Sequence, residues 1–173
     1  MKKSILSTVA VVVVLSSSVY AAKDVHVGLS QAEIFKKSTQ VVNVGFGRDE
    51  IWDSGFMMGV AADVQMGDFS KVTDINTSTS GAVTNDYFYG LSADVKIGYS
   101  PIKSLSIYGL GSVQVQTISS TGGAGFGYGG GVTYAVTDSF AVSAEYKTYS
   151  MQFDGVLDYD YSTAGINMKY TWQ

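Results

Sequence analysis

The C-terminal segment, residues 159–172, alternates between two kinds of side chain with almost no error. Its apolar positions are Ala164, Ile166, Met168, Tyr170 and Trp172, and the small or polar positions between them are Thr163, Gly165, Asn167, Lys169 and Thr171. Successive side chains of a β-strand point to opposite faces, so the pattern predicts a strand between an apolar and a polar medium. A half-buried strand of a soluble protein would show the same pattern, so repetition along the chain has to decide.

The period of two recurs in seven earlier segments. The predicted strands lie at about 24–33, 40–49, 55–67, 86–99, 104–117, 124–136, 139–150 and 159–172. Each has about 10 residues or slightly more, the length that a tilted strand needs to cross a bilayer. Met57, Tyr108 and Leu110 are the large residues that break the polar face. The chain therefore reads as all-β, with eight membrane-spanning strands.

The N-terminus predicts export. Lys2 and Lys3 precede an apolar run through Leu15, which is followed by serines and the small-residue site Val19-Tyr20-Ala21. This order is typical of a secretory signal peptide, cleaved here after residue 21 or 22. The apolar run is well short of the roughly 20 residues that a transmembrane helix needs. We expect a signal peptide at 1–22 and one β-barrel domain at 23–173.

Composition narrows the alternatives. The chain has no cysteine, which excludes a disulfide scaffold and thiol chemistry. Without Lys2 and Lys3, nine basic residues face fifteen acidic ones, and this acidic balance argues against nucleic acid as a partner. Lipid cannot satisfy unpaired backbone N–H and C=O groups, so strands in a membrane must close on themselves. The predicted fold is an eight-stranded antiparallel up-and-down transmembrane β-barrel.

The connections are expected to differ between the two ends of the barrel. With the N-terminus at the periplasmic end, short turns fall at 50–54, 100–103 and 137–139. The connections at the other end fall at 34–39, 68–85, 118–123 and 151–158, and 68–85 is by far the longest. Bacterial barrels pair short periplasmic turns with longer extracellular loops, so the asymmetry has the expected sign.

Aromatic residues gather near both ends of the predicted strands. A ring with a polar tip favours the headgroup zone, so two clusters predict interfacial girdles. The outer girdle would contain Tyr87, Tyr89, Phe126 and Tyr128, and the periplasmic girdle Tyr99, Tyr134, Phe140, Tyr170 and Trp172.

The inward positions predict a charged lumen. Three acids face three bases there, namely Asp63, Asp94 and Glu145 against Lys96, Lys147 and Lys169. Eight strands enclose a space just wide enough for side chains to fill, so this lumen polar network is expected to plug the barrel. A very narrow pore lined by the same charges is the alternative, and the glycines at 125–131, which keep one wall low, favour it.

Enzyme and cofactor sites have little support in the sequence. The only histidine, His26, lies near the periplasmic end of the first strand, far from the outer leaflet where lipid-modifying barrels work. The acids near the 68–85 connection match no calcium-loop spacing, and Gly122 to Gly131 has no Lys-Ser/Thr partner for a phosphate loop. We therefore expect no enzyme activity, no catalytic residue, no metal and no cofactor.

A family resemblance rests on the run from Gly129 to Val142, followed by Glu145-Tyr146. This strand, tight Thr-Asp turn and strand look like the hairpins of small bacterial outer-membrane β-barrels. The mature chain is similar to the OmpA/OmpX-type and opacity-type barrels of the porin family, which implies the bacterial outer membrane as its location. Tyr170-Thr171-Trp172 resembles the terminal aromatic signal that the barrel-assembly machinery recognises, although Gln173 follows where the family normally ends on the aromatic residue.

Three functions are compatible with these features. The first is a structural or surface-interaction barrel whose outer loops, chiefly 68–85, contact a host or envelope ligand. The second is a small passive pore for ions or small solutes. The third is a soluble lipocalin-like ligand binder, which would need apolar residues inside. The partners expected for the first are outer-membrane lipid, lipopolysaccharide and the barrel-assembly machinery, with no nucleic acid.

Overall fold

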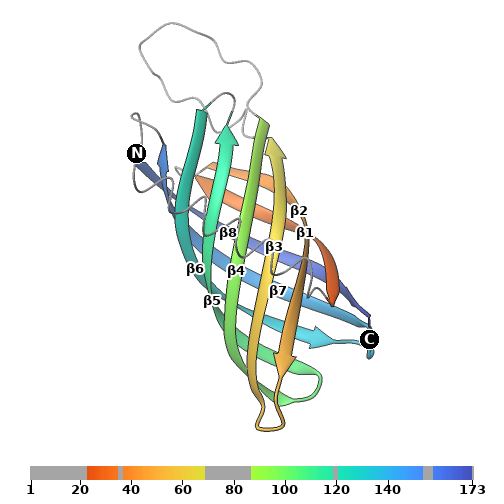
Figure 1. The fold of residues 1–173 in the computed structure, drawn as a ribbon. Coiled ribbons are helices and arrows are strands. Elements are labelled where there is room, and N and C mark those ends of the chain that lie inside the picture. The colour runs from red at the N-terminus through yellow and green to blue at the C-terminus, as the bar shows by residue number, and fades with distance from the viewer. Residues whose placement is uncertain (1–22, 35–36, 69–86, 119–120, 154–157, 173) are drawn as a thin grey trace, which may run out of the picture.

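The computed structural model describes residues 23–34, 37–68, 87–118, 121–153 and 158–172, and these ranges are almost entirely β-structure (Figure 1). The predicted signal peptide, residues 1–22, lies outside the described residues. The eight strands are β1 (Asp24–Ile34), β2 (Lys37–Ile51), β3 (Phe56–Asp68), β4 (Tyr87–Ile102), β5 (Leu105–Ile118), β6 (Thr121–Ala135), β7 (Phe140–Phe153) and β8 (Asp158–Thr171). No helix among the described residues is long and apolar enough to cross a membrane.

The strands form a closed antiparallel barrel in sequence order. β1 pairs with β2 on one side and with β8 on the other, from Asp24↔Thr171 to Ile34↔Tyr161, so the sheet has no free edge. The predicted up-and-down barrel of eight strands is confirmed. Closure satisfies the backbone groups that an open sheet would leave unpaired in lipid.

The strands are strongly staggered around the barrel. One row of paired residues runs from Asp24 through Gly47, Ala61, Asp94, Ser112, Gly127, Tyr149 and Tyr161 and returns to β1 at Ile34. From 24 to 34 the row advances ten residues, which is the shear of the barrel. Such a shear requires strands that tilt by roughly 35–45° from the barrel axis.

Two of the outer connections are shorter than predicted. Strand pairing continues to Ile34↔Lys37 and to Ile118↔Thr121, so only two residues join β1 to β2 and β5 to β6. The predicted loops at 34–39 and 118–123 were therefore too long, and 151–158 also gives residues to β7 and β8. The alternation of apolar and polar residues fades where the strands extend beyond the apolar layer. Backbone pairing does not depend on this alternation, so the strands continue past their predicted ends. Residues 69–86, most of the longest connection, lie outside the described part of the chain.

The turns at the opposite end are tight, as predicted. Residues 52–55, 103–104 and 136–139 join the strands there. Gly55 has a φ of 83°, a conformation that favours glycine, and its N–H donates to the Trp52 carbonyl at 2.8 Å. At 136–139, the backbone N–H of Phe140 donates to the Thr137 hydroxyl at 3.0 Å. We call this the periplasmic end and the other the outer end, following the predicted orientation.

The two faces of the sheet differ in polarity as the alternation predicts. Large apolar side chains face outward, and Leu29, Phe126 and Ile166 each expose 60% or more of their surface. Met57, Tyr108 and Leu110, which break the polar face in the sequence, are buried together inside the barrel. This is the reverse of a soluble protein, because the apolar surface lies outside and the buried interior is largely polar.

Candidate functional site

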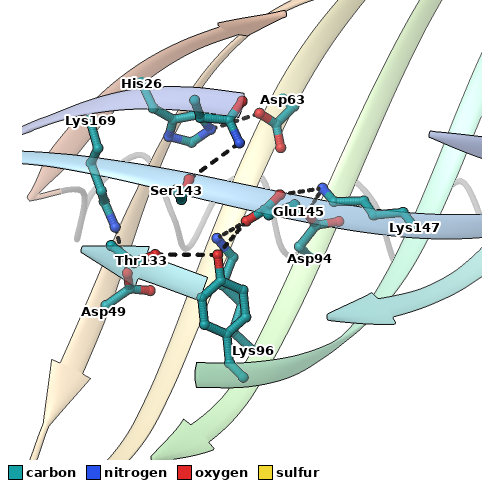
Figure 2. Close-up of polar contacts among 12 residues, drawn as sticks. His26, Asp49, Asp63, Asp94, Lys96, Thr133, Ser143, Glu145, Lys147 and Lys169 are labelled. Atoms are coloured by element: carbon teal, nitrogen blue, oxygen red, sulfur yellow. Dashed lines mark hydrogen bonds and ion pairs between the residues drawn. The ribbon is translucent and has the colours of Figure 1, made fainter. Parts of the chain in front are cut away.

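The lumen of the barrel is the candidate site, because the charged residues of the strand interiors gather there. Asp94 and Lys147 are buried, and Lys96 and Glu145 have side chains that are less than a tenth exposed. They come from β4 and β7, which lie across the lumen from one another (Figures 1 and 2). Ion pairs between these strands therefore span the interior.

The first cluster is built around Glu145. Lys96 Nζ donates to Glu145 Oε1 at 2.8 Å (Figure 2). The Tyr108 hydroxyl donates to the same oxygen at 2.8 Å. Lys147 Nζ lies 3.3 Å from Glu145 Oε2 and also pairs with Asp94. The Lys96 ammonium sits 4.9 Å from the centre of the Tyr108 ring, within the range of a cation–π contact. Each charge thus has an opposite charge beside it.

The second cluster is a chain of five groups toward the periplasmic end. Lys169 Nζ bridges Asp49 Oδ2 at 2.5 Å and Asp24 Oδ2 at 3.1 Å. His26 continues the chain, with Nδ1 3.3 Å from Asp24 Oδ1 and Nε2 2.7 Å from Asp63 Oδ1. Carboxylates accept and do not donate, so an imidazolium with both ring nitrogens protonated satisfies both contacts.

Uncharged polar groups extend the packing toward the outer end. Gln114 Nε2 donates to Gln65 Oε1 at 3.2 Å, and the Tyr161 hydroxyl donates to Gln114 Oε1 at 2.5 Å. Tyr161 stacks on Tyr149 with ring centroids 5.0 Å apart. These rings form a buried apolar cap with four further side chains, Ala32, Val41, Phe88 and Met151.

Two small cavities remain between these groups. One of about 10 Å³ is lined by both charged clusters, including His26, Asp63, Lys96 and Glu145. The other, of about 20 Å³, is lined by Asn43, whose side-chain oxygen has no hydrogen-bond partner among the described residues. A cavity of roughly 10–15 Å³ holds one water molecule, so each has room for about one.

The inward glycines of β6 are covered by large neighbours. A Cβ on Gly127 would lie 2.5 Å from the Tyr149 ring, and one on Gly131 would lie 2.8 Å from the Tyr108 ring. The absent side chains make room for these rings. The space beside the glycines of 125–131, which the sequence suggested as a possible water path, is therefore occupied by the rings of Tyr149 and Tyr108.

The structure brings the predicted lumen residues into two adjoining clusters. Asp94, Lys96, Glu145 and Lys147 make the first, while Asp63 and Lys169 belong to the second. Sequence reasoning missed Asp24, Asp49 and Tyr108 as members. The alternation could have identified the two aspartates. Asp24 lies two residues before the inward-facing His26, and Asp49 lies six residues after the inward-facing Asn43, so each points to the same face as its reference residue.

The predicted girdle residues are on the outward face. Their exposed fractions run from 41% to 72%, and the set is Tyr87, Tyr89, Tyr99, Phe126, Tyr128, Tyr134, Phe140, Tyr170 and Trp172. Phe140 and Tyr170 are paired across β7 and β8 and meet edge to face, with centroids 6.1 Å apart. No group of three or more potential metal ligands occurs among the described residues.

Comparison with solved structures places the fold among small outer-membrane barrels. Neisserial surface protein A (NspA) matches with a TM-score of 0.58 and 12% identity, over 87% of this chain and 96% of its own. Ail, the attachment invasion locus protein of Yersinia pestis, in complex with the heparin analogue sucrose octasulfate, gives 0.53 and 13%, over 87% and 97%. The outer membrane enzyme PagL gives 0.54 and 12%, over 86% and 99%. At these identities the likeness shows the fold alone.

Sequence comparison identifies the family. No curated protein sequence matches this chain closely enough to be counted. A family model does match, over residues 7–171, and its description is outer membrane protein beta-barrel domain. This match covers nearly the whole chain and agrees with the closed barrel, its apolar outer face and its polar interior. The chain therefore belongs to the outer membrane protein beta-barrel domain family and is a protein of the bacterial outer membrane.

Proposed function

We propose that this protein is a non-conducting anchor whose barrel holds the outer connections at the cell surface. The observation that carries the closed lumen is its packing, because paired charges and the Tyr149–Tyr161 cap fill the described part of the interior, where the two cavities between the charged clusters measure about 10 and 20 Å³. A continuous water path needs a wider interior than eight strands usually enclose. The lumen network is then structural, and function lies in the loops.

The surface role is supported by the lengths of the outer connections. Of the outer connections, 69–86 is the longest stretch between two strands, and loops on a rigid scaffold commonly carry binding function. Two proteins of similar fold are called a surface protein and an attachment invasion locus protein. Ail was solved with a sulfated heparin analogue, whereas this chain has a net charge of −4. We therefore propose a neutral or cationic ligand, since a polyanion would be repelled.

Planar-bilayer conductance of the refolded protein tests the closed lumen. Heat-dependent gel mobility first establishes that the barrel has folded. We expect no stable channel steps from the unmodified protein, and none from a Lys103→Glu control in the exposed β4–β5 turn. Repeatable steps whose size changes in Lys96→Glu, but not in Lys103→Glu, would replace this proposal with the passive pore.

Protease digestion of intact cells tests the surface role. Cleavage confined to 69–86, with the barrel fragments retained in the membrane, is the expected result. A variant in which Asn-Gly replaces 69–86 should fold equally well and lose binding to host cells or matrix. Equal binding by this variant and the full chain would place the contact elsewhere.

An enzyme function has one point in its favour, since PagL, of similar fold, is an outer membrane enzyme. A nucleophilic site needs a base within hydrogen-bond reach of a hydroxyl. Here His26 is held between Asp24 and Asp63, and none of its hydrogen bonds among the described residues goes to a serine or threonine. Its burial inside the barrel also separates it from lipid, so we propose a structural role for His26.

The membrane-related partners follow from the outer surface. Exposed apolar side chains on every strand fit lipid and lipopolysaccharide chains, and they oppose a lipocalin-like binder with an apolar interior. Release of the protein from membranes without detergent would instead support the soluble lipocalin-like binder.

We also propose recognition by the barrel-assembly machinery through the exposed Trp172. Trp172→Ala should lower insertion in cells several-fold while leaving refolding in detergent unchanged, and equal loss in both would assign Trp172 a purely structural role.

A further inference from the structure

The outward face of the barrel is apolar to different heights on its two sides. On β4, every outward position from Tyr99 to Tyr87 is apolar, and six apolar positions follow one another on β3. The outward rows of β5 and β6 hold apolar residues and glycines, without a polar side chain, from Leu105 to Val115 and from Tyr134 to Ala124. On β1 only Val25, Val27 and Leu29 are apolar before polar residues begin. The outer halves of β7, β8, β1 and β2 instead carry a polar wall of outward-facing residues: Thr148, Ser150, Gln152, Asp160, Ser162, Gln31, Glu33, Ser38 and Gln40.

Strand register places this polar wall at the level of the opposite apolar surface. The row through Val25 reaches β5, halfway around the barrel, at Val113. Because a full turn climbs ten residues, half a turn climbs five, and Val113 is level with position 30 of β1. Gln31 therefore lies between Val113 and Val115 in height. By the same stagger, Ser162 on β8 is about level with Phe126 on β6.

The apolar stretch of β2 is short, because polar residues follow it on the periplasmic side and on the outer side. Outward-facing Arg48 and Glu50 pair with each other below Phe46, and Gln40 follows above Val42. Each outward step advances about 6.6 Å along a strand, or about 5 Å in height at a tilt near 45°. The three apolar positions of β2 thus span about 10 Å, against about 28 Å for the seven of β4. Outer-membrane barrels normally carry an apolar band about 25 Å tall.

We propose that the polar wall contacts a locally thinned bilayer, in which headgroups and water of the outer leaflet descend to the level of Gln31. The barrel would then distort the membrane on the β7–β8–β1–β2 side only. Amides, hydroxyls and carboxylates left in hydrocarbon would be unsatisfied, whereas thinning a bilayer costs little for each ångström of mismatch. Tyr146 lies at this boundary, because its exposed ring occupies the outward position of β7 next below Thr148.

A second copy of the chain is a poorer partner for this surface. The charged members of the polar wall are Glu33 and Asp160, both acidic. Two walls facing each other across a two-fold axis would bring like charges together in a poorly hydrated interface. Lipid headgroups and water can instead solvate each carboxylate separately.

Single-cysteine labelling tests the proposal, and the chain has no native cysteine to remove. Nitroxides at Gln31→Cys and Ser162→Cys are compared with level-matched controls at Val113→Cys and Phe126→Cys. The folded variants are placed in phosphatidylcholine vesicles at low protein density. Collision with a water-soluble nickel chelate, relative to oxygen, is measured by electron paramagnetic resonance.

We expect the nickel-to-oxygen ratio at the two wall positions to exceed that at their controls by about tenfold or more, since water is excluded from the hydrocarbon core. Equal ratios within both pairs would overturn the proposal, whether all four sites are dry or all four are wet. A wall signal that is low at high protein density and rises on dilution with lipid would also overturn it, because a second copy would then be the partner.

Discussion

Lys147 shows how a single residue holds the interior of this barrel together. Its ammonium is buried between Asp94 and Glu145, and Asp94 also accepts a hydrogen bond from Ser112 at 2.5 Å. Taking these charges out of water is costly, and their mutual contacts offset the cost only while every partner is present. The network is therefore sensitive to the loss of one member.

We predict that Lys147→Met lowers the free energy of unfolding by about 3–5 kcal/mol, because it leaves buried carboxylates with one cation fewer. Urea unfolding in vesicles, followed by tryptophan fluorescence, measures the change. The control Lys103→Met, in an exposed turn, should change stability by less than about 0.5 kcal/mol. The double variant Asp94→Asn, Lys147→Met should lose less than the single one, and a single variant as stable as the control would contradict this account.

Glycine positions distinguish the packed interior from the lipid face. A Cβ on inward Gly129 would collide with the Tyr146 carbonyl, whereas one on outward Gly111 would meet nothing within 4 Å. We predict that Gly129→Ala destabilises the barrel by about 1–3 kcal/mol through overpacking. Gly111→Ala should be neutral or stabilise it by about 0.5 kcal/mol. Unfolding midpoints compare the two, and equal midpoints would show that the lumen has room to spare.

The sequence predicts which charged residues face the lumen, but not which of them pair with each other. Inward parity identifies Asp63, Asp94, Lys96, Glu145, Lys147 and Lys169 as lumen candidates. It does not say that Lys169 reaches Asp49 rather than Glu145, since that depends on the stagger of strands far apart in the chain. Tyr108 was noted only as a break in the pattern, yet its hydroxyl binds Glu145.

At the scale of the elements, the strand interiors could be predicted and their outer ends could not. The contrast between lipid and lumen marks both faces of β4 from Tyr87 to Tyr99, and the strand found there matches. Beyond the apolar layer no such contrast exists. Pairs such as Ile34↔Lys37 continue the ladder through backbone hydrogen bonds alone, which leave no periodic trace in the sequence.

The β2–β3 turn depends on one glycine. Gly55 has a positive φ, and a Cβ there would lie 2.7 Å from the Tyr99 ring and 2.8 Å from the Ser100 carbonyl oxygen. We predict that Gly55→Ala lowers the free energy of unfolding by about 1–2 kcal/mol, the usual cost of a left-handed conformation for an L-residue. Urea titration measures it against Asp53→Ala in the same exposed turn. A turn that accepts both changes equally would have a different backbone from the one described.

Closure is the property of the whole molecule from which its stability in lipid follows. It depends on the β1–β8 pairing, which joins residues from opposite ends of the chain and which no local pattern specifies. The sequence implied it only through a physical requirement, since eight strands in lipid cannot leave an edge unpaired. The same closure sets the shear of ten, and with it the level of every side chain around the barrel.

A disulfide across the β1–β8 seam provides the test of closure. Val27 and Met168 are directly paired on the lipid face, and paired antiparallel residues lie within the Cα separation that a disulfide accepts. We predict that Val27→Cys, Met168→Cys oxidises to an intramolecular bond in the folded protein, which after boiling migrates as a loop of altered mobility that reductant abolishes. Val27→Cys, Val142→Cys is the control, because β7 does not pair with β1. Cross-linking of both pairs to the same extent would indicate a mobile, open sheet, and cross-linking of neither would place the seam in a different register.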